Sequence, residues 1–326
     1  MSSIGGWIGS PVRRPATPRL TRTVRVGVLL ALVVALLLGC ATRGPGTGIA
    51  APRGSLVVLL TNDDGYLSPG IRAVRVALEA AGHDVTMVAP LENRSGSGSS
   101  TTTGGALELR EQGPKTWSVG GTPADAVRVG LDVVLRGRTP DLVVSGANFG
   151  QNVGPSTLAS GTVGAALTAM QAGVPAIAVS VAIDPREARA EPRFASTLAA
   201  FDDAAALVAR VVKQLDETRP DDGALLPRYT ALNINHPARE SAALAGIAWA
   251  AIGRSEGFVF GYERQDGAPE TLRVVFRPTE TVESVERADT TLLGEGYVTF
   301  TLLDGDVMAD RRVGDRLEWR LEPLVP

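Results

Sequence analysis

Short apolar runs alternate with segments of helical periodicity along most of this chain, and this alternation limits the fold more than any other feature of the sequence. Ser55–Thr61 is an apolar run that ends in a polar turn, as expected of a strand buried on both faces of a parallel sheet. Pro69–Ala81 follows with helical spacing, and Asp84–Ala89 has the pattern of a second strand. The rhythm continues with predicted helices over 124–135, 162–172 and 195–215 and predicted strands over 142–144, 176–181 and 229–235. The sequence therefore predicts a doubly wound, mostly parallel α/β sheet.

The pattern changes after Asp221. Short alternating runs such as 271–276 and 296–302 predict strands, and few helical segments separate them. We expect one domain over residues 55–326, in which the residues from about 222 form a β-rich C-terminal extension.

The N-terminus has the composition of a targeting segment. Residues 1–39 hold five arginines and no acid, so the formal charge of −3 for the whole chain leaves −8 for the remainder. The fourteen uncharged residues Val26–Gly39 are too few for a transmembrane helix, which needs about 20 apolar residues, and suit a signal peptide.

Cys40 is the only cysteine of the chain and directly follows this apolar run. Leu37–Cys40 is similar to a bacterial lipobox, in which the cysteine is lipidated. We therefore expect a lipoprotein-type signal peptide over 1–39, a flexible Gly- and Pro-rich tether over 40–54, and a lipid anchor at Cys40 in the bacterial cell envelope. An uncleaved N-terminal anchor and an ordinary cleaved signal remain alternatives, and both also export the domain.

The near-balanced charge, with a pI of about 5.6, gives no support to nucleic-acid binding through a broad basic face, so no nucleic-acid polymer is expected as a partner.

Two adjacent carboxylates, Asp63 and Asp64, stand just after the first predicted strand, where open α/β sheets bind ligands. Like charges this close disfavour each other's ionisation unless a cation or strong donors compensate them. Two interpretations stay open here: a metal site, or a turn in which the acids cap the next helix.

Two further Gly-rich segments also follow predicted strands. Residues 93–98 (N-R-S-G-S-G) begin a long Ser/Thr/Gly loop, and residues 145–154 (S-G-A-N-F-G-Q-N-V-G) lead to Ser160, Gly161 and Thr162 at the start of a helix. A helix N-terminus of this kind favours an anion such as phosphate, although capping alone also explains Ser160.

The candidate ligands at this sheet edge are oxygen atoms, which favours Mg²⁺ or Mn²⁺ over zinc. The two histidines are expected to be peripheral: His83 on the surface in a turn, and His236 near another strand end, from which reaching the cleft is the minor alternative.

At this point the residues resemble those of the SurE family of survival protein nucleotidases. The matching motifs occur in family order and cover about residues 55–305: Asn62–Gly65 with Pro69–Ile71, Asn93–Gly96, Gly121–Asp125, Ser145–Asn148, Ser160–Val163, Asn233–Asn235 and Gly296–Thr299.

The resemblance implies a Rossmann-like core and a metal-dependent phosphomonoesterase, similar to an acid phosphatase, that hydrolyses nucleoside 5′- and 3′-monophosphates. It also implies a homodimer or homotetramer assembled through the β-rich C-terminal part. By motif, Asp63, Asp64, Ser95 and Asn148 would hold one Mg²⁺ or Mn²⁺ per subunit, and one of the two aspartates would position the attacking water. Asn93, Ser160, Gly161 and Thr162 would bind the phosphate.

Some positions depart from the family pattern. Ala159 stands where the family usually has tyrosine, which leaves the substrate preference open. The alternatives are a non-catalytic phosphate- or nucleotide-binding lipoprotein and a phosphatase of other small phosphoesters or of polyphosphate.

Overall fold

The computed structural model describes residues 53–255, 258–278, 281–307, 311–322 and 324. The predicted signal peptide, the lipidation site at Cys40 and nearly all of the tether lie outside these residues. None of the helices in the described part has the length and apolar content to span a bilayer.

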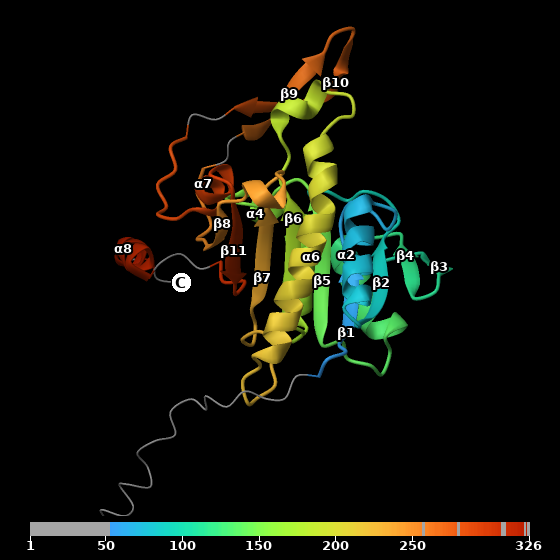
Figure 1. The fold of residues 1–326 in the computed structure, drawn as a ribbon. Coiled ribbons are helices and arrows are strands. Elements are labelled where there is room, and N and C mark those ends of the chain that lie inside the picture. Colours follow the sequence, from blue (N-terminus) through green and yellow to red (C-terminus); the bar gives the residue numbers. More distant parts are fainter. Residues whose placement is uncertain (1–52, 256–257, 279–280, 308–310, 323, 325–326) are drawn as a thin grey trace, which may run out of the picture. The chain divides into compact units, whose positions relative to one another are not determined.

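A nine-stranded sheet forms the centre of the domain (Figure 1), in the order β3-β4-β2-β1-β5-β6-β7-β11-β8. All neighbouring pairs are parallel except β3 with β4 and β7 with β11. The strands are β1 (Val57–Thr61), β2 (Asp84–Pro90), β3 (Leu109–Gly113), β4 (Thr116–Val119), β5 (Leu142–Phe149), β6 (Ala176–Val181), β7 (Ala231–His236), β8 (Gly246–Trp249) and β11 (Tyr297–Leu303).

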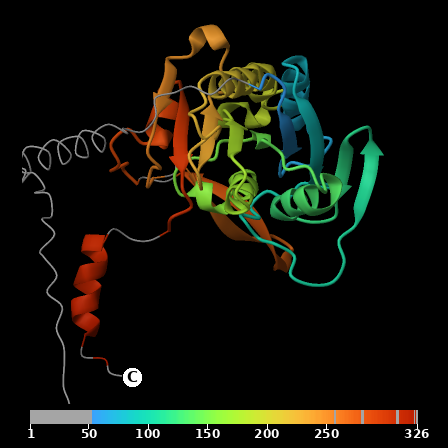
Figure 2. The ribbon, with the colours of Figure 1, turned by 90° about the horizontal axis from the view of Figure 1, so that it is seen from below.

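Helices cover both faces of the sheet, as the view along the strands shows (Figure 2). One apolar layer packs under α2 (Pro69–Ala80) and α6 (Ala195–Glu217), and the other packs under α3 (Pro123–Val129) and α5 (Gly161–Gln171). The remaining helical segments are η1 (Gly130–Val134), α4 (Ser156–Ala159), η2 (Pro185–Arg189), η3 (Ser241–Ala243), α7 (Asp289–Gly294) and α8 (Arg311–Leu321). The predicted doubly wound α/β fold is therefore confirmed.

The strands after residue 222 divide between two sheets. Strands β7, β11 and β8 extend the main sheet, while β9 (Phe258–Gln265) and β10 (Ala268–Pro278) form a separate antiparallel hairpin.

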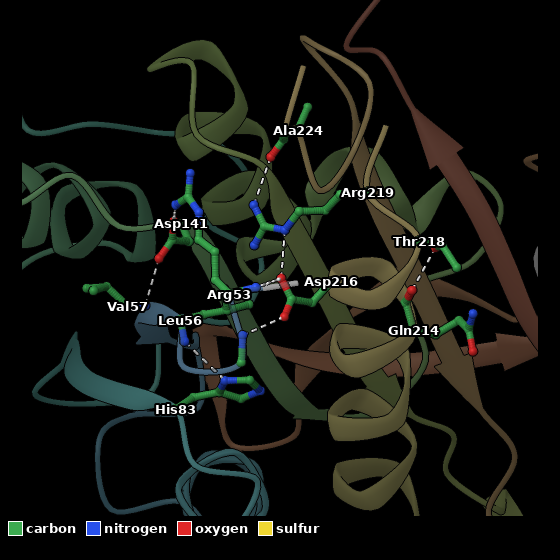
Figure 3. A network of polar contacts seen from close by, with 12 residues as sticks. Arg53, Leu56, Val57, His83, Asp141, Gln214, Asp216, Thr218, Arg219 and Ala224 are labelled. Atoms are coloured by element: carbon green, nitrogen blue, oxygen red, sulfur yellow. Dashed lines mark hydrogen bonds and ion pairs between the residues drawn. The ribbon is translucent and has the colours of Figure 1, made fainter. Parts of the chain in front are cut away.

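The chain enters the domain at the edge of the sheet where the parallel strands begin (Figure 3). The amides of Arg53 and Gly54 donate hydrogen bonds to the Asp216 carboxylate over 3.2 and 2.9 Å. Arg219 forms a buried ion pair of 2.6 Å with the same carboxylate, and Arg53 also pairs with Asp141. Asp216 thus joins the first described residues to the end of α6.

The expectation for His83 was wrong. The side chain is only 8% exposed, and its Nδ1 accepts a hydrogen bond from the amide of Leu56 over 3.3 Å. The turn before β2 folds against the start of β1, so the histidine lies inside the domain. Burial lowers its pKa, which favours the neutral ring.

Candidate active site

The loop after β1 carries the two candidate carboxylates, and a neighbouring asparagine shapes it. The Asn62 side-chain amide donates to the carbonyl of Gly65 over 2.9 Å and to the hydroxyl of Ser68 over 2.8 Å. Helix α2 has Ser68 as its N-cap and no acidic residue in its first turn. The alternative in which the aspartates cap this helix is therefore excluded, and both carboxylates are available for another role.

Asp63 points toward the N-terminus of α5. Its Oδ1 accepts a hydrogen bond from the Thr162 hydroxyl over 2.7 Å, and its side chain is 2% exposed. Burial raises the pKa of Asp63, while the Thr162 hydroxyl and the amides of Thr162 and Gly161 oppose that rise. The helix terminus that the sequence suggested for a phosphate therefore also stabilises a carboxylate of the protein itself.

Asp64 is fixed from two other loops. Its Oδ2 accepts a hydrogen bond from the amide of Phe149 over 2.8 Å, and its Oδ1 accepts one from Nδ2 of Asn93 over 3.2 Å. Burial, together with the charge of Asp63, raises the pKa of Asp64 to about 7. The structure thus brings Asp64, Asn93 and the end of β5 together, as predicted for loops that follow parallel strands.

The side-chain oxygen of Asn148 has no hydrogen-bond partner among the described residues. The Nδ2 atom of the same amide donates to the carbonyl of Gly150 over 2.6 Å, and this contact fixes the amide orientation. The oxygen atom, Oδ1, is buried. A buried acceptor without a donor is costly, so this atom is suited to a cation.

The loop that carries Ser95 lies against the same carboxylates. The amide of Arg94 donates to the carbonyl of Asp63 over 2.7 Å, and the amide of Ser95 donates to Oδ1 of Asn93 over 2.9 Å. Ser95 itself is exposed. These contacts place the Ser95 segment beside Asp63 and Asp64.

Small residues let this loop continue directly over α5. The amide of Gly98 donates to the carbonyl of Ala159 over 3.0 Å. A Cβ atom at Gly164 would lie 2.1 Å from the carbonyl oxygen of Gly98, and one at Gly161 would lie 2.7 Å from Oγ of Ser97. The approach of the Gly98 backbone therefore requires glycine at position 164, whereas a Cβ atom at position 161 would crowd the side chains of Ser97 and Asp63.

Ser97 was not identified from the sequence. Its Oγ is buried without a hydrogen-bond partner in the described part of the chain, close to Gly161 and the Asp63 side chain. In the sequence, the one signal for Ser97 is its position in the Ser/Thr/Gly loop that begins at residue 93.

Ser160 is the N-cap of α5, where its Oγ accepts a hydrogen bond from the amide of Val163 over 3.1 Å. Capping is thus one established role of Ser160. Its hydroxyl hydrogen has no acceptor among the described hydrogen bonds and can still be donated to a ligand.

Buried polar contacts fix the loop between Asn148 and Ser160. The amide of Asn152 donates to Oδ1 of Asn235 over 2.7 Å, and its carbonyl accepts from Asn233 over 2.9 Å. Further along, the amide of Gly154 donates to the fully buried Asp289 over 3.1 Å. The Asn-Ile-Asn motif of β7 therefore supports the site through this loop, and Asp289 does so without having been identified from the sequence.

His236 lies apart from the two aspartates. It is 2% exposed, its Nδ1 lies 2.7 Å from the carbonyl oxygen of Pro237, and it lines a cavity of about 300 Å³ beside Asp203 and Arg210 of α6. Burial lowers its pKa. A larger cavity of about 350 Å³, lined in part by Arg219, lies at the other end of the strands, where β5, β6 and β7 begin. Neither cavity is lined by Asp63 or Asp64, so neither contains the candidate site.

The donor set fits a hard divalent cation. Neither buried Asp63 nor half-buried Asp64 has an ion pair among the described residues, and the free Oδ1 of Asn148 lies on the strand whose end contacts Asp64. No group of three or more His, Cys, Asp or Glu side chains in the described ranges is arranged to hold a metal ion. Any such site therefore depends on hydroxyl and amide oxygen atoms as well as on the two carboxylates.

The sequence profile of the family described as Survival protein SurE matches residues 58–257. The chain belongs to the SurE family. A protein named 5′-nucleotidase SurE from Gloeobacter violaceus is 36% identical over 265 residues, which cover 79% of this chain and 93% of the relative. One named 5′-nucleotidase SurE 1 from Burkholderia lata is 34% identical over 76% of this chain and 89% of the relative.

The SurE fold is also found among solved structures. The crystal structure of the SurE protein from Aquifex aeolicus superimposes with a TM-score of 0.65 at 31% identity, covering 81% of this chain and 99% of that one. The expected family, fold class and enzyme class, a phosphoric monoester hydrolase, are thereby confirmed.

Proposed function

We propose that this protein is a divalent-metal-dependent phosphomonoesterase that hydrolyses nucleoside 5′- and 3′-monophosphates to nucleoside and phosphate. SurE family membership and the names of the relatives support nucleotidase activity. The observation that carries the metal dependence is the pair of adjacent carboxylates, buried Asp63 and half-buried Asp64, together with the buried Oδ1 of Asn148, which has no hydrogen-bond partner among the described residues.

Asp63, Asp64, Ser95 and Asn148 would hold the cation, which we propose to be Mg²⁺ or Mn²⁺. A cation held there would offset the negative charge of the phosphate and would promote ionisation of the attacking water.

The two aspartates have different hydrogen-bond surroundings. Asp63 is committed to the N-terminus of α5 through Thr162, whereas Asp64 is less buried and its Oδ1 faces Asn93. We therefore assign to Asp63 the role of a fixed ligand, and to Oδ1 of Asp64 the positioning of the attacking water and acceptance of its proton.

The remaining phosphate oxygen atoms need donors. The hydroxyl of Ser160 retains its hydrogen for this purpose, and Asn93 can contribute its side-chain amide next to Asp64. Gly161 and Thr162 surround the same helix terminus. Positioning and charge neutralisation supply most of the catalysis in phosphoryl transfer, so these donors are expected to affect turnover as well as binding.

The test is hydrolysis of AMP, GMP and p-nitrophenyl phosphate with Mg²⁺ or Mn²⁺, with EDTA, and with Asp64→Asn. Asp202→Asn, at an exposed position of α6, is the matched carboxylate control. We expect activity with the metal, loss with EDTA or Asp64→Asn, and no change with the control. Activity that survives chelation and Asp64→Asn would overturn the mechanism, and AMP binding without phosphate release would leave a non-catalytic binding protein.

Two further properties belong to this proposal. We propose export to the bacterial cell envelope with a lipid anchor at Cys40, based on the Arg-rich and apolar N-terminal sequence. We also propose assembly into a homodimer or homotetramer through the part after residue 222, which light scattering of the purified protein tests.

A further inference from the structure

An aromatic pair begins at the candidate active site. Phe149 directly follows Asn148, and its amide is the group that donates to Asp64 over 2.8 Å. Its ring meets that of Phe194 edge to face, with centroids 5.5 Å apart and an interplanar angle of 80°. Both side chains are partly exposed. An aromatic surface therefore starts one residue from a proposed metal ligand.

The pair is held in place from behind. The ring of Phe149 also contacts Phe201 of α6, with centroids 6.3 Å apart, and Phe201 belongs to the buried core. These contacts favour one position of the Phe149 ring. The Phe149 side chain would therefore lose little conformational entropy when a ligand stacks on it.

Phe194 has an unusual backbone conformation. It is the N-cap of α6, with φ 55° and ψ 40°, in the left-handed region that few non-glycine residues adopt. The turn is fixed by Glu187, whose carboxylate accepts hydrogen bonds from the amide and hydroxyl of Ser196 over 3.0 and 2.9 Å. This backbone conformation sets the position of the Phe194 ring at the start of α6.

A guanidinium group completes the surface. Cζ of Arg193 lies 5.4 Å from the centroid of the Phe194 ring, and Arg193 is exposed without an ion pair among the described residues. Planar guanidinium groups stack on bases as aromatic rings do.

We propose that Phe149, Phe194 and Arg193 bind the base of the nucleotide by stacking, and so select nucleoside monophosphates over phosphomonoesters that lack a base. This inference rests on the proposed function, which places the phosphate at Asp63 and Asp64. Stacking tolerates any base because every base has a π-face, so the preference is for the nucleoside class and not for one base.

The experiment compares AMP with ribose 5-phosphate, which keeps the sugar and the phosphate but has no base. We expect Phe194→Ala to raise KM for AMP by roughly 5- to 150-fold, the range that corresponds to the loss of one base–aromatic stack. The kinetics of ribose 5-phosphate should not change. Tyr229→Ala is the matched control, because Tyr229 is also an exposed aromatic residue with a positive φ, of 58°. Tyr229 stands just before β7, at the end of the sheet where the parallel strands begin, away from the two aspartates.

Two variants cover the case in which Phe194→Ala does not fold. Phe149→Leu keeps an apolar side chain and removes the ring, and should weaken AMP selectively. Phe194→Trp keeps a stacking face and should retain the preference for AMP.

The outcomes distinguish a failure of the stacking assignment from a failure of the proposed phosphatase function. An equal loss for both substrates, or no preference for AMP in the unaltered protein, would overturn the stacking assignment while leaving the phosphatase in place. If neither substrate were hydrolysed, the proposed function would fail and this assignment with it.

Discussion

The hydroxyl of Thr162 donates a hydrogen bond to Oδ1 of Asp63 over 2.7 Å, between residues 99 positions apart in the sequence. The contact orients one carboxylate of the candidate site from the first turn of α5. Groups that orient metal ligands in this way commonly change metal affinity or activity 10- to 100-fold when they are removed.

Thr162→Val keeps the shape of the side chain and removes this donor. We expect a loss of roughly tenfold or more in metal affinity or in kcat/KM for AMP, because Asp63 loses its orientation. A Mn²⁺ titration of activity measures it. Thr168→Val is the control on the same helix, since the Thr168 hydroxyl donates to the carbonyl of Gly164 and to no other group in the described part of the chain. An equal effect of both variants would contradict the assigned role.

Gly161→Ala should disturb the site by crowding. The added Cβ would lie 2.7 Å from Oγ of Ser97 and 2.8 Å from Cβ of Asp63, both closer than normal contacts. We expect more than about tenfold loss of kcat/KM, since small displacements of reacting groups cost this much. Gly104→Ala has open space around its Cβ position and should behave like the unaltered protein.

Asn235→Ala should loosen the loop between Asn148 and Ser160. It leaves the buried amide of Asn152 without its acceptor, which costs about 1–3 kcal/mol. We expect a lower urea midpoint together with a lower kcat. An unchanged kcat in folded protein would show that this loop does not position the site.

Asp216 should make the stability depend on pH. Burial alone would raise the pKa of Asp216, but the hydrogen bonds from Gly54, Arg53 and Arg219 outweigh it, and the pKa lies below its ordinary value. The stabilisation is therefore complete above the pKa of an unfolded aspartate, about 3.9, and is lost as the pH falls through the lower folded value.

Asp216→Asn should accordingly cost about 3 kcal/mol near pH 7, because it leaves the buried Arg219 unpaired. Urea unfolding from pH 7 down to pH 3 should show the difference from the unaltered protein shrinking at the acid end. Asp221→Asn, at an exposed position nearby, should have no such effect. A pH-independent difference would contradict the ionic role.

Cys40→Ala tests the proposed lipid anchor. Labelling of the protein in cells with a palmitate analogue should be lost in this variant, and maturation should be sensitive to globomycin. Labelling that persists in Cys40→Ala would remove the lipoprotein proposal.

Local patterns were sufficient to predict the alternating core. The strand before Asp63 and the helix from Pro69 match the structure within two residues, because buried parallel strands and amphipathic helices each have a strong period. The hairpin of β3 and β4 was missed because β3 (Leu109–Gly113) is polar and almost wholly exposed, which leaves no alternation to detect.

The geometry of the candidate site could be predicted only in part. Motifs at strand ends pointed to Asp63, Asp64 and Asn148, because topology brings such ends to one edge. The contact of Thr162 with Asp63 and the support from Asp289 depend on how distant segments pack, and no local pattern encodes that. The burial of His83 was missed for the same reason.

The contacts of Asp216 with Arg53, Gly54 and Arg219 have a practical consequence. Arg53 enters at the edge where the parallel strands begin, whereas Asp63 and Asp64 follow the opposite end of β1. A fusion partner, affinity tag or solid support attached ahead of Arg53 would therefore be joined at the end of the sheet remote from the two aspartates. Immobilised protein of this kind should keep the end of the sheet that carries Asp63 and Asp64 open to small molecules in solution.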